Sequence, residues 1–448
     1  MEYTLLSTWE LLRGENDLLN VLDQYVGWEK IPPFYRPGRT GWLQLDKPIE
    51  VFNAGNSVKI HSIKLKGIGY CDDQFNITKP TSLYFNRIFP HLGFSREGKF
   101  RLVESEQAPL GGLEYSRART EYDISLRLWE SGCPAVVPIR LYRYHQSFNG
   151  SHGESSLAVV ITGIPKSNPF RADCAYRYDN EKDFANPMNN HWPFSSPQTQ
   201  EERDFVIELG KKLNLDDSDN LSLSLISFFS EKYGRTLRKF HEAGFYRYSG
   251  SLDNYDYCLE TDEVYLIDLD SSRPLDECTD IEKSLQVIRD LASAFFNLSA
   301  GLMHPWYVKK FPLHHVIETA PFESILRGYF HDVPAIWIER VNRVFMRYYN
   351  ALHQQVYDVA DKIVAETDRD KQVEKWKPFW MDRKEVYSLL MVINWFLYVK
   401  SAINERYPCE MDWEDLMDQI AEFAGPQIAG SIDEEIRDLV ASFTLMGA

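Results

Sequence analysis

The sequence predicts an α+β protein with two lobes, a β-rich N-terminal lobe and a mainly helical C-terminal lobe that continues into a helical C-terminal extension. Three observations lead to this fold class. Residues 41–70 alternate between apolar and polar side chains as strands do, most of the chain after residue 200 follows a helical period, and a short strand–turn–strand interrupts the helices near residue 260. A regular alternation of strands and helices, as in a doubly wound parallel sheet, does not fit this pattern.

The predicted N-terminal lobe, residues 1–164, contains strands on both sides of one internal helix. Gly132 and Pro134 follow that helix directly, and both residue types end helices. In the strand that precedes it, Lys64 and Lys66 fall on one face because successive side chains of a strand alternate. We expect strands over Gly41–Leu45, Val58–Lys66, Ala135–Leu141 and Leu157–Ile164, and a helix over Glu114–Glu130.

A polar stretch rich in Pro, Asn and Ser, residues 165–200, is the expected connection between the lobes. The remainder divides into a C-terminal lobe, residues 201–300, which carries the loops discussed below, and a helical part of that lobe, residues 301–448. The expected strand–turn–strand consists of Tyr255–Leu259 and Val264–Leu269, and the expected helices are Glu202–Leu213, Leu221–Ala243, Ile281–Leu298, Ile336–Val364 and Arg383–Glu405.

Composition and charge limit the classes of partner. A net charge of −17 disfavours general binding to nucleic acids or anionic membranes, because both attract basic surfaces. The six cysteines are scattered without a C-x-x-C pair, which indicates reduced thiols rather than a disulfide framework or a zinc site. No signal peptide is visible, and the longest apolar run, Val386–Val399, is too short to cross a bilayer. We therefore expect a cytoplasmic protein with no nucleic-acid or membrane partner.

Two residues of the N-terminal lobe are candidates for binding a nucleotide. Lys66 lies at the end of a predicted strand, in Leu65-Lys66-Gly67-Ile68-Gly69, where its ammonium group can reach phosphates. Glu121 lies on the predicted helix that follows, where a carboxylate can pair with that lysine and orient it. Taken alone, each is more simply explained as a surface residue of a strand or a helix.

Two further candidates lie in the C-terminal lobe. Asp253 and Asn254 follow the long helix and its Gly244-Phe245 stop, on a loop that can supply a general base and a Mg²⁺ ligand. An Asp-Asn turn without any catalytic role explains the same pair, since both residues favour turns. Asp268 ends an apolar strand, where a buried carboxylate needs a partner. A metal ion is one such partner, and a cap from Ser271 or Ser272 is another.

The order of these residues is more informative than any one of them. A strand Lys, a helix Glu, a loop Asn and a strand-end Asp follow one another in the order in which protein-kinase-like folds assemble a site for ATP and Mg²⁺. Lysine offsets phosphate charge, glutamate fixes the lysine, and Asn with Asp supplies the oxygen ligands that Mg²⁺ prefers. The sequence therefore predicts a protein-kinase-like bilobal fold with ATP and Mg²⁺ as cofactors.

At these residues the sequence resembles the selenoprotein O family, kinase-like proteins that transfer AMP from ATP to protein hydroxyl groups. The similarity spans about residues 65–270. In the N-terminal lobe it lies in the strand Leu65-Lys66-Gly67-Ile68-Gly69 and in Glu121 of the helix, which Gly132-Cys133-Pro134 ends. In the C-terminal lobe it lies in Gly244-Phe245 with Asp253-Asn254, and in Ile267-Asp268. The resemblance implies that Asp253 acts as the catalytic carboxylate, in place of the Asp that protein kinases carry five residues before the metal-binding Asn. That earlier position is Ser249 in this chain.

The sequence also departs from that family. About forty extra residues, from roughly 70 to 109, separate the Lys66 strand from the helix, where the family has a short arginine-bearing loop. Arg117, Arg119 and Arg171 are candidate phosphate-binding substitutes for that arginine, and we single out Arg117 and Arg171. Asp270 stands where the family has Gly, and a reactive Cys near the C-terminus is missing.

Three functions follow from the sequence. The first is transfer of AMP to a hydroxyl group of a protein or a small molecule, with Asp253 as the catalytic residue. The second is phosphoryl transfer by a small-molecule or protein kinase that uses the same site. The third is an inactive nucleotide-binding scaffold, which the retention of Lys66, Glu121, Asn254 and Asp268 disfavours.

Overall fold

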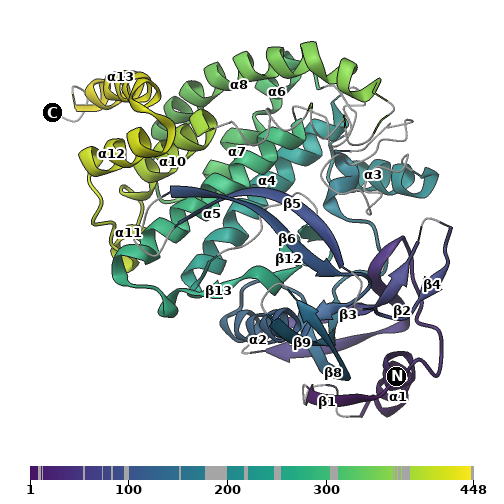
Figure 1. Cartoon of the computed structure of the whole chain (residues 1–448). Coiled ribbons are helices and arrows are strands. Elements are labelled where there is room, and N and C mark those ends of the chain that lie inside the picture. The colour runs from purple at the N-terminus through teal and green to yellow at the C-terminus, as the bar shows by residue number, and fades with distance from the viewer. Residues whose placement is uncertain are drawn as a thin grey trace.

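A computed structural model of the chain shows a mixed α/β protein with an antiparallel sheet in its N-terminal part and helices in its C-terminal part (Figure 1). The structure describes residues 1–8, 12, 14–53, 56–72, 74–81, 84–94, 100–150, 153–176, 199–215, 220–246, 254–302, 311–366, 368, 371, 375 and 384–444.

The N-terminal sheet has the strand order β1-β8-β9-β3-β2, and each neighbouring pair runs antiparallel. Strand β3 lies inside the sheet, where Lys66 is paired with Val160 of β9 on one side and with Thr40 of β2 on the other. Three of the four predicted strands lie within longer strands of this sheet, whereas the predicted strand Ala135–Leu141 begins two residues before β8, which starts at Val137. Its members are β1 (Tyr3–Thr8), β2 (Gly38–Asn53), β3 (Asn56–Cys71), β8 (Val137–Gly150) and β9 (Gly153–Ile164), with the short strands β4 (Ile77–Thr78) and β7 (Leu113–Glu114) at its margins.

Two helices accompany the sheet. Helix α2 (Tyr115–Ser131) is the helix that the sequence predicts, and it ends at Gly132, whose left-handed φ of +74° lets the N–H of the next residue, Cys133, donate to the carbonyl oxygen of Leu128 at 3.0 Å. Helix α1 (Asn16–Gly27), which is not among the predicted helices, packs its buried face against the sheet core. Helix α2 packs against β8 and β9, so its inward residues face the sheet beside β3.

A long hairpin occupies the extra segment of about forty residues that the sequence left unassigned. Its strands, β5 (Tyr84–Phe94) and β6 (Phe100–Pro109), pair antiparallel and form a sheet of their own. In Figure 1 this hairpin extends away from the N-terminal sheet and crosses the helical part. There β5 lies against α5 (Asp280–Leu302) and β6 against α12 (Trp413–Ala424), so the hairpin connects both parts of the molecule.

The helical part has one continuous hydrophobic core around α4 (Leu221–Glu242). No helix in the described part of the chain combines the length and hydropathy that a membrane span requires. The helices that share this core with α4, α5 and α12 are α3 (Gln200–Lys212), α6 (Leu313–Thr319), α7 (Pro321–Tyr329), α8 (Ala335–Val364), α10 (Lys384–Tyr398), α11 (Ile403–Arg406) and α13 (Pro426–Thr444).

One predicted helix is wrong in its extent. The sequence predicts a single helix over Arg383–Glu405, but α10 ends at Tyr398 and a turn precedes the short α11. In that turn the carboxylate of Asp332 accepts hydrogen bonds from the Ser401 hydroxyl and from the Ala402 N–H, the latter at 2.7 Å. This long-range contact supplies the backbone N–H with a partner outside the helix, which explains the break.

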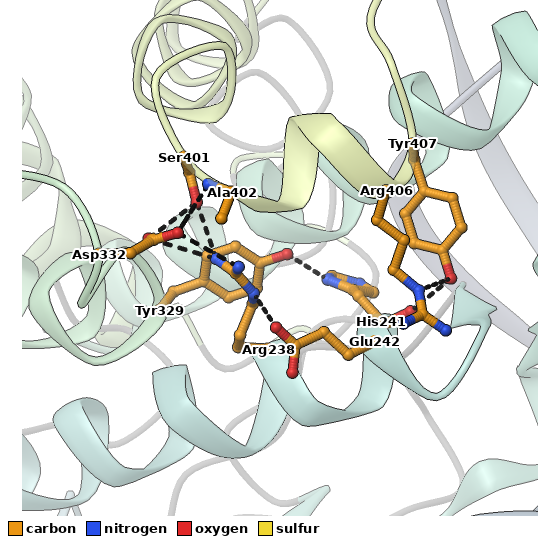
Figure 2. A network of polar contacts seen from close by, with 9 residues as sticks. All are labelled: Arg238, His241, Glu242, Tyr329, Asp332, Ser401, Ala402, Arg406 and Tyr407. Atoms are coloured by element: carbon orange, nitrogen blue, oxygen red, sulfur yellow. Dashed lines mark hydrogen bonds and ion pairs between the residues drawn. The ribbon is translucent and has the colours of Figure 1, made fainter.

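The same carboxylate belongs to a polar network at the C-terminal end of α4 (Figure 2). Arg238 of α4 reaches Asp332 at 3.3 Å and the Ser401 hydroxyl at 2.8 Å. One turn later His241, which is fully buried, bonds the Tyr329 hydroxyl at 2.7 Å and Asp290 of α5 at 3.2 Å. The network fixes the end of α4, from which the chain continues toward Asn254.

A small hairpin leads from Asn254 to Asp268. Its strands, β11 (Tyr255–Cys258) and β12 (Glu263–Leu266), match the predicted strand–turn–strand, although β12 ends three residues earlier than expected. Leu266 exchanges backbone hydrogen bonds with the segment before β8, through Pro134 O and Val136 N. The hairpin is thereby tied to the N-terminal sheet as well as to the helices.

Helices α4 and α7 approach each other through two glycines. A Cβ at Gly234 would collide with the carbonyl oxygen of Ile325, and a Cβ at Gly328 would collide with that of Glu231. We predict that Gly234→Ala lowers the free energy of unfolding by about 1–3 kcal/mol, because the two backbones must separate. The matched variant Gly430→Ala, on an open face of α13, should instead raise it by about 0.5–1 kcal/mol. Urea unfolding compares them, and equal effects would contradict this packing.

Asp332 provides a second test. Burial alone would raise its pKa, but the Ala402 N–H, the Ser401 hydroxyl and Arg238 hold that pKa below its usual value. Because the folded-state pKa is the lower one, the stabilisation is present above about pH 4 and is lost as the pH falls through the folded pKa. We predict that Asp332→Ala costs about 2–3 kcal/mol at pH 7. The difference from wild type should shrink at pH 3 in urea unfolding, and a difference that does not depend on pH would contradict this role.

Candidate functional site

Lys66 and Glu121 form a buried ion pair. The Lys66 ammonium nitrogen lies 2.5 Å from Glu121 Oε2, and their side chains are 3% and 0% exposed. Lys66 reaches this position from the interior strand β3, and Glu121 from the buried face of α2. The pairing that the residue order suggested is present in the structure, while its functional role stays a prediction.

Asp268 joins the same lysine from the C-terminal part. Its Oδ1 accepts a hydrogen bond from the Lys66 ammonium group, and its side chain is 30% exposed, so it forms the open side of the cluster. The backbone at Asp268 has φ +64° and ψ +49°, a left-handed conformation that residues with a Cβ adopt only rarely, although Asp does so more often than most. Residues with a strained backbone of this kind are concentrated at functional sites, where the surrounding structure holds them in that conformation.

Asp270 lies on the short 3₁₀ turn that follows, Leu269–Ser271, and is surrounded by cations. Its Oδ2 lies 3.1 Å from the Lys66 ammonium nitrogen, 3.6 Å from Arg39 Nη2 and 3.7 Å from Arg117 Nε. The sequence singled out Arg117 but missed Arg39. No local signal could have found Arg39, because it reaches the site through the pairing of β2 with β3, where Thr40 is opposite Lys66.

The carboxylates of this cluster fit a divalent cation. Glu121, Asp268 and Asp270 each offer one oxygen, and these oxygens lie within 4.8 Å of one another. Glu121 Oε1 is buried and accepts no hydrogen bond from any described residue, and the Lys64 ammonium nitrogen lies 3.8 Å from it, so this oxygen has capacity for a closer partner. An all-oxygen donor set is the one that Mg²⁺ prefers. The residues present are therefore compatible with the metal that the sequence predicted.

Asp268 and Asp270, the two carboxylates that the C-terminal part contributes to the cluster, are held in the ionised form. Burial would raise the pKa of Asp268, but Lys66 and Lys64 hold that pKa well below its usual value. Burial likewise opposes ionisation of Asp270, and Arg117 and Lys66 lower its pKa. Each carboxylate thus keeps its negative charge at neutral pH because cations surround it.

The two buried lysines of β3, Lys64 and Lys66, have pKa values that are shifted in opposite directions. Burial lowers the pKa of Lys64 to about 8, and the attraction of Glu121, whose Oε1 is 3.8 Å away, only partly opposes that effect. Burial also opposes the charge of Lys66, but Asp268, Asp270 and Glu121 together raise its pKa above the usual value. Lys66 is therefore firmly charged at neutral pH, whereas Lys64 is a buried cation without sufficient compensation.

The remaining predicted residues are placed only in part. Asn254 is buried, and its carbonyl oxygen accepts a hydrogen bond from Ile267 N at 3.0 Å, which sets it beside the residue that precedes Asp268. Asp253, the predicted catalytic residue, and Ser249 lie outside the described residues. Of the predicted connection 165–200, residues 177–198 also lie outside them.

Arg171 and Arg119 lie apart from the Asp270 side of the cluster. Arg171 precedes the short 3₁₀ helix Ala172–Ala175 and lies close enough to Lys64 and Asp256 for its charge to act on both. Burial lowers the pKa of Lys64, and Arg171 adds to that effect; burial raises the pKa of Asp256, and Arg171 opposes that rise. Asp256, which the sequence did not single out, pairs with Lys166 at 2.5 Å. Arg119 forms an exposed pair with Asp123 at 3.2 Å, away from the buried carboxylates.

Comparison with known proteins adds little to this site. Neither the protein-family models nor the curated proteins gave a match to this chain. Among solved structures, the chain is similar to WaaP in complex with acyl carrier protein, at 12% sequence identity and a TM-score of 0.33, over 80% of this chain and 100% of that one. Identity and TM-score are too low to assign a fold or a function by similarity, so we base the proposed function on the residues of this chain.

The contrast between the two lysines is testable. Because the folded state lowers the pKa of Lys64 from 10.5 to about 8, the charged form destabilises the fold below about pH 8, and stability rises with pH between about 8 and 10.5. We predict that Lys64→Met stabilises the protein at pH 7 by about 3 kcal/mol, because a change of one pKa unit corresponds to about 1.4 kcal/mol of free energy.

The gain from Lys64→Met should shrink as the pH rises above 8, which urea unfolding at pH 7, 8.5 and 10 would measure. Lys66→Met is the matched control on the same strand face. It should destabilise the protein at all three pH values, because it leaves the carboxylates of Glu121 and Asp268 without their common partner. Destabilisation by both variants at pH 7 would contradict the opposite states of the two lysines.

Proposed function

We propose that this protein is an ATP- and Mg²⁺-dependent transferase with a protein-kinase-like arrangement of its two parts, in which residues 1–164 form the N-terminal lobe. The observation that carries the proposal is the meeting of Lys66, Glu121 and Asp268 in one buried cluster. These residues come from an interior strand, the following helix and the end of a hairpin strand, and their order along the chain is that of kinase-like sites.

The charges of the cluster suit a bound polyphosphate. Among the described residues, the cations Arg39, Lys64, Lys66 and Arg117 exceed the three carboxylates by one charge. Lys66 would bind phosphate oxygens while Glu121 keeps it in place. Asp268 and Asn254 would hold Mg²⁺, with Glu121 and Asp270 close by, and the bound metal would offset further phosphate charge.

We assign the transferred group to AMP on the resemblance to the selenoprotein O family. An acceptor hydroxyl oxygen forms a bond to the α-phosphorus of ATP, the bond from that phosphorus to the bridging oxygen breaks, and pyrophosphate leaves. Asp253 takes the hydroxyl proton as general base, since Ser249 cannot serve in that role. Lys64 and Arg171 add positive charge at the other end of the site, which is consistent with a second place for phosphates.

Two other functions share parts of this site. Phosphoryl transfer requires the same lysine, asparagine and strand-end aspartate, and it differs only in the phosphorus atom that the acceptor attacks. An inactive scaffold would bind the nucleotide without either reaction. The acceptor in our proposal is a hydroxyl group of a protein or a small molecule, and we place the protein in the cytoplasm without a nucleic-acid or membrane partner.

ATP that is labelled at one of two different phosphates distinguishes these functions. The purified protein is incubated with Mg²⁺, candidate acceptors and ATP labelled at either the α- or the γ-phosphate. We predict incorporation of the α-label only, which reports AMP transfer. Incorporation of the γ-label alone would replace our proposal by phosphoryl transfer, and nucleotide binding without incorporation of either label would favour the scaffold.

Substitutions at the site test whether it is responsible for incorporation of the label. Asp268→Asn should abolish Mg²⁺-dependent incorporation, and Asp253→Ala should reduce it by about 10²–10⁴-fold, the usual range for positioned proton transfer. The matched control is Asp276→Asn, which changes an exposed carboxylate outside the cluster and should leave incorporation unchanged. Full turnover by Asp253→Ala would remove the catalytic role of that residue whichever label appears.

A further inference from the structure

Three cations from three elements converge on a single carboxylate oxygen. Lys66 of β3, Arg39 of β2 and Arg117 of α2 lie 3.1 Å, 3.6 Å and 3.7 Å from Asp270 Oδ2. The side chains of Lys66, Arg39 and Asp270 are 3%, 7% and 7% exposed, and that of Arg117 is 17% exposed. We call these three basic residues the cation cradle.

The carboxylate fills this cradle poorly. Hydrogen bonds between charged groups are usually about 2.7–2.9 Å long, and all three distances exceed that range. Asp270 Oδ2 is buried and accepts no hydrogen bond from any described residue. Three donors therefore surround one oxygen that accepts a hydrogen bond from none of them, and a larger anion with more acceptor oxygens would offer each donor an oxygen of its own. A phosphate group has that size and that number of oxygens.

We propose that Asp270 occupies, in the unliganded protein, the place that a phosphate group of the bound ligand takes, so that it competes with phosphate inside the same molecule. Asp268 does not fit this role, because Lys66 is its contact in the cluster and its side chain is partly exposed. The identity of the ligand as a nucleotide rests on the function proposed above. The competition between the carboxylate and a phosphate group rests on the cradle alone.

The proposal has a measurable consequence. A phosphate that enters the cradle must displace Asp270, and the displaced carboxylate remains a negative charge a few ångströms away. Without a metal ion to compensate that charge, wild-type protein should bind polyphosphate weakly. Removing the charge of Asp270 should therefore strengthen the binding of polyphosphate in the absence of a metal ion, even though the substitution alters a residue of the site. A residue that only helped to build the site would weaken binding when changed.

Isothermal titration of the full chain with inorganic tripolyphosphate, in the presence of EDTA and at low salt, tests this. We predict that Asp270→Asn binds tripolyphosphate at least tenfold more tightly than wild type. The matched control Asp276→Asn, which changes an exposed carboxylate outside the cradle, should bind like wild type. Affinity of Asp270→Asn equal to or weaker than that of wild type overturns the proposal.

The cradle is also tested without changing Asp270, in case Asp270→Asn does not fold. Arg39→Met and Arg117→Met each remove one cation and keep all three carboxylates, and each should weaken tripolyphosphate binding by about tenfold or more. Unchanged affinity in both variants overturns the proposal. Circular dichroism of each variant confirms the native fold before titration.

This experiment separates the inference from the proposed function. Tripolyphosphate without metal reports only on the cradle, whereas the labelled ATP reports on nucleotide chemistry. Tighter tripolyphosphate binding by Asp270→Asn, with no ATP binding and no label transfer, would support the inference and contradict the function. Label transfer by wild type, with no gain in tripolyphosphate affinity for Asp270→Asn, would support the proposed function and contradict the inference.

Discussion

The burial of Lys66 among three carboxylates is the interaction on which the arrangement of this protein depends. Glu121 belongs to the helix beside the sheet, whereas Asp268 and Asp270 follow the hairpin of the C-terminal part. One ammonium group therefore connects the two parts of the chain. A buried ion that loses its partner destabilises a protein by about 3–5 kcal/mol, so the cluster constrains how β3, α2 and the hairpin end can be placed.

The backbone around Lys66 is shaped to allow this cluster. Gly67 and Gly69 have φ of +87° and +152°, and a Cβ at Gly67 would lie 2.5 Å from the carbonyl oxygen of Ala158. Strand β7, which directly precedes α2, packs against this bend through Leu113, and this contact brings Glu121 of α2 toward Lys66. In this structure the two glycines of the Leu-Lys-Gly-x-Gly segment thus serve close packing. On the other side, the strained backbone of Asp268 turns its carboxylate toward the same lysine.

The electrostatics of the site are unbalanced in a way that favours an anionic ligand. Lys66 is fully compensated, but Lys64 is buried with a lowered pKa, and Asp270 sits loosely among three cations. Stability alone would be better served by apolar residues at several of these positions, since burying charges is costly. Retained but poorly satisfied charges are typical of sites whose best partner is a ligand. The hairpin β5–β6, which lies against α5 and α12, further ties the sheet to the helical part beyond this site.

The sequence by itself determined the elements whose signals are local. Alternation predicted β3, a helical period closed by Gly132 predicted α2, and the order of Lys66, Glu121 and Asp268 indicated which residues would meet. Tertiary structure alone decided which distant residues join them. Arg39 reaches Asp270 through the register of β2 on β3, and Asp332 ends α10 from seventy residues away. Such contacts depend on pairing between segments that are far apart in the chain, and no pattern within either segment records that pairing.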